Sequence, residues 1–69
     1  MVKGLQRMGY AWTRQKGDHV SMTTLQNGEH HVTVPLHSPV RVGTLAGILD
    51  SVAAHLGISR RQLLRDMRV

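Results

Sequence analysis

The sequence predicts an α+β fold with the element order α-β-β-β-α-α, in which helices pack on one face of a three-stranded antiparallel sheet. Two patterns support this: short stretches between residues 10 and 34 alternate apolar and polar side chains, and residues 45–67 repeat apolar side chains at helical spacing. The chain has 69 residues, a length that indicates one small domain, residues 1–69, and excludes a multidomain enzyme.

A short helix is expected over residues 2–8, where apolar side chains recur at every third position: Val2, Leu5 and Met8. Gly4 weakens this helix, because glycine is less favourable than alanine in a helix interior by about 1 kcal/mol. Gly9 indicates the end of the helix, since glycine readily takes the left-handed conformation that commonly follows the last turn.

The first strand is expected over residues 10–16, and it contains the only two aromatic residues, Tyr10 and Trp12. We expect both rings to point into the core. Proteins that bind single-stranded nucleic acid by stacking need several exposed aromatic side chains. A nucleic-acid partner is therefore expected to be recognised through its phosphates, 2′-hydroxyls or groove shape.

The second and third strands are expected over residues 19–25 and 30–34, with apolar side chains on one face and polar ones on the other. The core-facing set is Val20, Met22, Thr24, Val32 and Val34, and the polar set is His19, Ser21, Thr23, His31 and Thr33. Turns at Gly17-Asp18 and Asn27-Gly28 connect the strands, because these residue types tolerate positive φ. Pro35 is expected to end the third strand.

Two helices are expected after a loop over residues 35–43. Thr44 is a candidate N-cap for the first, whose apolar side chains follow helical spacing up to Gly57, the expected C-terminal stop. A capping box from Ser59 to Gln62 indicates the start of the last helix, which is expected to continue through Met67.

The composition indicates a polyanionic partner, because nine Lys and Arg against four Asp and Glu give a net charge of +5. The chain has no cysteine, so it has no disulfide framework and no thiolate metal site. It also has no apolar run of membrane-spanning length, and its first residues lack the apolar core of a secretory signal. We therefore expect a cytoplasmic protein that does not enter a membrane.

Five histidines are present, and His19 is the candidate for chemistry. On the polar face beside Arg14 and Lys16, its imidazole is placed to transfer protons near a bound phosphate. A surface histidine at a turn is the simpler interpretation from the residue alone.

The other histidines give no support for a metal site, and no cofactor is expected. His30 and His31 lie on opposite faces of a strand and cannot bind one metal together. A mixed site of His19, His31 and His37 lacks a supporting carboxylate or cysteine pattern. His55, late in a helix, is expected to be solvated.

Dispersed motifs over most of the chain resemble the HicA toxin family. They are Leu5-x-x-Met8-Gly9-Tyr10, Arg14-Gln15-Lys16-Gly17-Asp18-His19, Val32-Thr33-Val34-Pro35-x-His37 and Gly43-Thr44-Leu45-x-x-Ile48-Leu49. The resemblance implies a fold like the double-stranded-RNA-binding domain, cleavage of messenger RNA and an antitoxin partner of the HicB type. It also implies that His19 is the catalytic residue, although Asp18 and Val20 stand where the family commonly has serine and a second histidine.

The function that this resemblance implies is that of the toxin of a type II toxin–antitoxin pair, a metal-independent endoribonuclease with one histidine as general acid or base. The residues expected to bind the RNA are Arg14, Lys16, Gly17 and Arg41. One alternative is a double-stranded-RNA-binding module of the same fold that does not cut. Another is a helix-turn-helix DNA-binding protein, suggested by residues 52–63 with Arg60 and Arg61.

Overall fold

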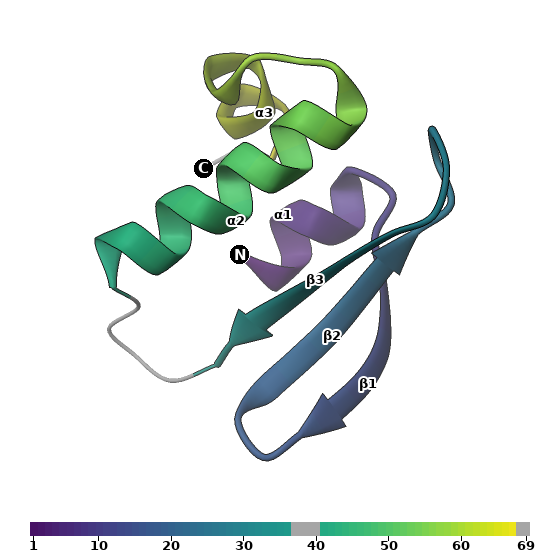
Figure 1. The fold of residues 1–69 in the computed structure, drawn as a ribbon, viewed down its shortest axis with the longest axis vertical. Coiled ribbons are helices and arrows are strands. Elements are labelled where there is room, and N and C mark those ends of the chain that lie inside the picture. The colour runs from purple at the N-terminus through teal and green to yellow at the C-terminus, as the bar shows by residue number, and fades with distance from the viewer. Residues whose placement is uncertain (37–40, 68–69) are drawn as a thin grey trace.

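A computed structural model gives the fold and describes residues 1–36 and 41–67 (Figure 1). The elements are α1 (Val2–Arg7), β1 (Ala11–Lys16), β2 (His19–Thr24), β3 (His30–Pro35), α2 (Val42–Leu56) and α3 (Arg60–Met67). The predicted order α-β-β-β-α-α and the α+β class are confirmed, and each predicted end lies within three residues of the observed one.

The three strands form one antiparallel sheet in the order β1-β2-β3, and the helices lie to one side of it (Figure 1). Burial alternates along β2 as predicted: Val20, Met22 and Thr24 are buried, while His19, Ser21 and Thr23 face the other way. We call the side of the sheet that carries this second set the open face. It is available for polar chemistry because the described helices lie on the other side of the sheet (Figure 1).

Apolar side chains from the three helices, from Tyr10 and from β2 and β3 make one core. Its members are Leu5, Tyr10, Val20, Met22, Val32, Val34, Leu49, Val52, Ala53, Leu63 and Met67. Gly4 is buried in this core, where the side chain of Met67 packs against it. A larger residue would push against Met67, which explains a glycine inside a helix that is only six residues long.

The expectation that Trp12 points into the core is wrong, whereas the one for Tyr10 is confirmed. Trp12 is 46% exposed and Tyr10 only 2%. All six residues of β1 are exposed, because β1 is an edge strand that extends beyond the helices. Trp12 lies opposite the buried Met22, on the helix side of the sheet, but too near its edge to be covered.

The N-cap prediction at Thr44 is also wrong, because α2 begins two residues earlier, at Val42. Arg41 is the N-cap residue: its backbone is extended, and its carbonyl accepts the first helical hydrogen bond, from the Leu45 amide at 2.9 Å. Gly57 ends the helix with φ 69°, as predicted. His37, named for a mixed metal site, lies outside the described residues.

His55 is half-buried, which corrects the expectation that it is solvated. Its ring stacks on that of His30 at 4.4 Å, and its Nε2–H donates to two carbonyls of the 25–29 loop, at 2.8 and 3.0 Å. The His30 ring in turn forms hydrogen bonds with two hydroxyls: Nδ1 with Tyr10 at 2.7 Å and Nε2 with Ser51 at 3.1 Å. Burial, reinforced by the positive charge of the neighbouring histidines, lowers the pKa of His30. This network fastens the β2–β3 loop to α2.

No single helix in residues 1–36 and 41–67 is long and apolar enough to cross a membrane. Only α2 and α3 taken together reach that length, and they are bent by 98°.

Candidate functional site

A register shift in β1 determines which side chains reach the open face. Directly opposed residues of neighbouring strands share a face. The opposed pairs are Trp12–Met22, then, after Thr13, Arg14–Ser21 and Lys16–His19. Strict alternation from Trp12 would have put Arg14 and Lys16 on the helix side of the sheet. The extra residue at Thr13 reverses this alternation, as β-bulges do, and places both cations on the open face.

The two cations and His19 meet in one hollow of about 570 Å³ on the open face. We call it the His19 hollow, and it is lined by Arg14, Gln15, Lys16, His19, Ser21 and Thr33. Three of the five residues predicted for the site are therefore neighbours. Ser21 and Thr33, which sequence reasoning did not single out, were nevertheless signalled by the alternation of the strands.

Asp18 holds the imidazole of His19 from the adjoining turn. Its Oδ1 lies 2.9 Å from His19 Nδ1, and both side chains are more than half exposed. The Asp18 backbone carbonyl accepts from the Leu36 amide at 2.6 Å, which ties the turn to the end of β3. An Nδ1–H that donates to the carboxylate leaves the lone pair on Nε2, so Nε2 is the atom suited to accept a proton from a ligand.

Gly17 and Arg41, the other two predicted residues, do not line the His19 hollow. Gly17 has φ 61° at the first position of the two-residue β1–β2 turn, and this positive φ is what the turn requires of it. Arg41 is exposed at the start of α2. The structure thus gives Gly17 a conformational role, and Arg41 is not among the residues that line the hollow.

A second hollow adjoins the first, and sequence reasoning missed it. We call it the His31 hollow; it has about 550 Å³ and is lined by Thr13, Arg14, Ser21, Thr23, Leu25, Glu29 and His31. Arg14 and Ser21 belong to both hollows. The signal available in the sequence was again the alternation, which put Thr23 and His31 on the polar face, but the pairing of β2 with β3 was needed to bring Thr23 beside His31 and Glu29.

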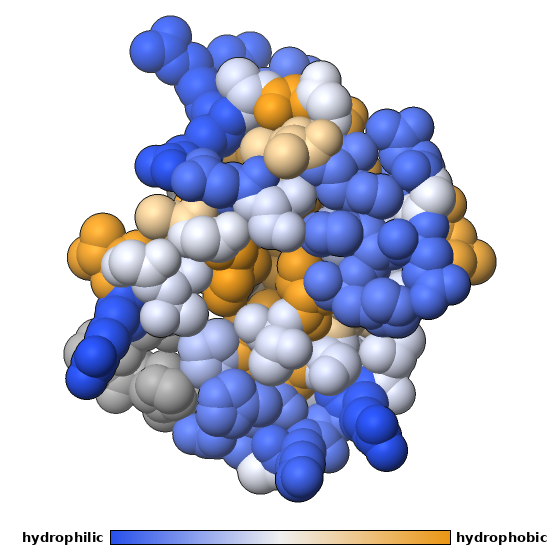
Figure 2. Space-filling view, viewed as in Figure 1, coloured by the Kyte–Doolittle hydropathy of each residue, from blue (hydrophilic) through white to orange (hydrophobic). Residues whose placement is uncertain are grey.

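Hydrophilic residues predominate on the surface shown in Figure 2, and hydrophobic residues reach it as separate patches. Arg60, one of the two arginines of the helix-turn-helix alternative, is engaged within the protein: its Nε donates to Asp50 Oδ1 at 2.8 Å. Arg14 and Lys16, by contrast, line the same hollow as His19.

A family model described as the HicA toxin of bacterial toxin–antitoxin systems matches residues 1–57. This match extends from α1 through the end of α2 and includes every residue that lines the two hollows. No curated protein and no solved structure matches the chain.

Proposed function

The chain belongs to the HicA toxin family of bacterial toxin–antitoxin systems, and on this premise we propose that it is an endoribonuclease that cleaves messenger RNA in the His19 hollow. Membership makes the protein the toxin of such a pair, with an antitoxin as its partner. The observation that supports the proposal most directly is the convergence of His19, Arg14 and Lys16 on the open face.

The chemistry uses the RNA, these side chains and solvent water. The 2′-hydroxyl of the RNA attacks the adjacent phosphorus while His19 Nε2 accepts its proton. The new O2′–P bond forms as the P–O5′ bond breaks, and the leaving 5′-oxygen takes a proton from water, which gives a 2′,3′-cyclic phosphate and a 5′-hydroxyl. Arg14 and Lys16 stabilise the negative charge that builds up on the phosphate oxygens.

The partner of the proposed enzyme is an antitoxin of the HicB type, and its place of action is the cytoplasm, where messenger RNA is translated. A chain with a net charge of +5 attracts both the RNA and an acidic partner surface over a distance. Such complementarity speeds association more than it strengthens the complex.

The proposal is tested with His19→Ala and Arg14→Ala, with Arg65→Ala as the control. Arg65 is exposed on α3, away from the open face, so its loss removes a charge without touching the hollow. We expect His19→Ala to lower the cleavage rate of a labelled RNA by about 100-fold or more, the range that a general acid or base contributes. The Arg14→Ala variant is expected to cut more slowly, and Arg65→Ala at the wild-type rate.

Cleavage is followed in a chelating buffer, and each variant is checked for an unchanged thermal midpoint. Cleavage by wild type that survives the chelator supports the metal-independent mechanism. Normal cleavage by His19→Ala contradicts the assignment. Wild-type protein that retains intact RNA, with an affinity that falls steeply with salt, indicates the non-catalytic RNA-binding module instead.

A further inference from the structure

We propose that the His31 hollow binds the base of a nucleotide next to the cut, and that Glu29 selects a base with N–H donors on its Watson–Crick edge, guanine best of all. This inference rests on the proposed function, since it names what the nuclease would recognise. It assigns a role to the second hollow of the open face, which the cleavage chemistry does not use.

The position of the His31 hollow suits a neighbouring nucleotide. It shares Arg14 and Ser21 with the His19 hollow, so the two hollows are neighbours. Along β2, the four-residue step from His19 to Thr23 spans about 14 Å at roughly 3.4 Å per residue. A phosphate held between Arg14 and His19 therefore leaves the adjoining nucleoside over Ser21 and Thr23.

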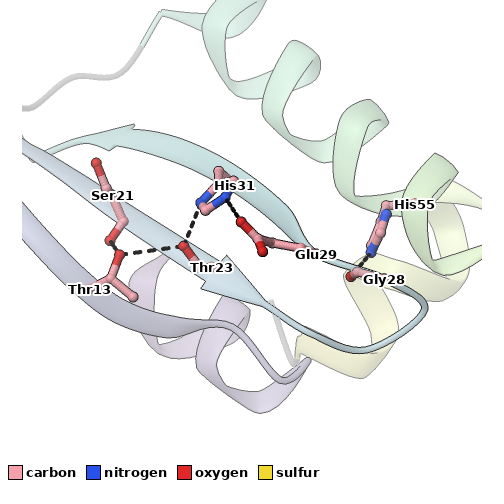
Figure 3. Close-up of polar contacts among 7 residues, drawn as sticks. All are labelled: Thr13, Ser21, Thr23, Gly28, Glu29, His31 and His55. Atoms are coloured by element: carbon pink, nitrogen blue, oxygen red, sulfur yellow. Dashed lines mark hydrogen bonds and ion pairs between the residues drawn. The ribbon is translucent and has the colours of Figure 1, made fainter.

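Hydrogen bonds at this hollow fix the carboxylate of Glu29 (Figure 3). His31 Nε2 lies 2.6 Å from Glu29 Oε2, and His31 Nδ1 lies 2.8 Å from Thr23 Oγ1. Thr13 Oγ1, 3.4 Å from Thr23 Oγ1, donates to the Ser21 carbonyl at 3.0 Å. With the Thr23 hydroxyl donating to Nδ1, Nε2–H donates to the carboxylate, so the bonded path runs from Thr23 on β2 through His31 on β3 to Glu29.

A carboxylate in this place favours a base over a phosphate. It repels the phosphate backbone but accepts hydrogen bonds from ring N–H and amino groups, and the edges of unstacked bases are what proteins read in single-stranded RNA. Guanine offers two parallel donors, N1–H and N2–H, which match the two oxygens of one carboxylate. Uracil offers a single N–H between two carbonyls, and these would face the carboxylate unfavourably.

The remaining lining residues give the base a partly apolar wall. Leu25 is 77% exposed and lines the hollow, so a base that lies against it covers apolar surface that is otherwise in water. The His31 ring is a planar group beside it, and the hydroxyls of Thr13 and Ser21 supply polar contacts. Because both aromatic residues lie off the open face, this wall takes the place of an aromatic platform.

The test measures binding in the His19→Ala background, so that its result does not depend on cleavage. Short single-stranded RNAs that differ at one base, guanine or uracil, are titrated by fluorescence anisotropy against His19→Ala alone and against His19→Ala with Glu29→Gln. The control is His19→Ala with Asp66→Asn, which removes one negative charge from an exposed position on α3. Glutamine keeps the shape of glutamate but presents one acceptor and one donor.

We expect the His19→Ala chain to bind the guanine RNA about tenfold more tightly than the uracil RNA, within the range of one bidentate contact. Glu29→Gln should reduce this ratio to below about twofold, while Asp66→Asn should leave it unchanged. An unchanged ratio in the Glu29→Gln variant, or equal binding of both RNAs by His19→Ala, overturns the inference. If His19→Ala shows the guanine preference but the wild-type protein does not cut, the proposed nuclease function fails and the base site stands.

Discussion

Replacing Gly4 by alanine should destabilise the protein, although alanine is the better helix former. Gly4 lies inside α1 and is buried against α3. A Cβ at this position would lie 2.7 Å from Met67 Cε, 3.0 Å from Met67 Cβ and 3.3 Å from Met67 Cγ. The Cε methyl is the flexible end of its side chain, but Met67 Cβ moves only if α3 moves with it.

The two opposing effects are of similar size. Alanine gains about 1 kcal/mol over glycine in a helix interior. An added methyl in a packed core costs about 1–3 kcal/mol, because neighbours are forced away from their preferred positions. Since Met67 is only 2% exposed, it has little room to retreat, and we take the upper part of this range. A cost of about 2–3 kcal/mol less this gain lowers the free energy of unfolding by about 1–2 kcal/mol, and each kcal/mol corresponds to roughly 4–8 °C in the thermal midpoint.

The matched control is Gly47→Ala in α2, where an added Cβ meets nothing within 4 Å. There the helix preference acts alone, so the midpoint should rise. Both variants are measured by thermal and urea unfolding followed by circular dichroism. Opposite signs for the two glycines support the packing of α1 against α3, whereas a stabilising Gly4→Ala would refute it.

Two further changes test the core and the histidine network. Trp12→Ala should lower the free energy of unfolding by less than about 1.5 kcal/mol, because the ring is 46% exposed. Tyr10→Ala should lower it by about 3 kcal/mol or more, because Tyr10 is buried. Equal losses of the two variants in urea unfolding would contradict the uncovered position of Trp12. The pKa of His30 is lowered in the folded protein, so the unfolded chain takes up the proton first and stability should fall as the pH drops below about 6.5. The His30→Gln variant should show a weaker fall in the thermal midpoint between about pH 7.5 and 5.5 than the wild type, and an equally steep fall would exclude His30 as the cause.

The order of elements and the apolar faces of β2 and β3 could be predicted because alternation and helical spacing are local properties of the sequence. The side to which Arg14 and Lys16 point could not be derived from alternation, since one extra residue at Thr13 reverses it and bulges have no simple local signature. Trp12 was misplaced for a related reason: the strand pattern gives the face of a side chain, but only the extent of the helices decides whether that face is covered. The Thr23–His31 contact depends on the pairing of two strands.

The bulge at Thr13 also explains how so small a protein can combine a core with a polar site. Before it, Tyr10, the residue that precedes β1, is buried in the core, and Trp12 aligns with Met22; after it, β1 contributes Arg14 and Lys16 to the open face. The side chains of Arg14, His19 and Glu29 are exposed, so replacing one of them should change stability by no more than about 0.5 kcal/mol. Stability and the proposed chemistry therefore reside on opposite faces of the same three strands. A loss of cleavage in His19→Ala, or of base preference in Glu29→Gln, would then report on RNA recognition and chemistry and not on folding.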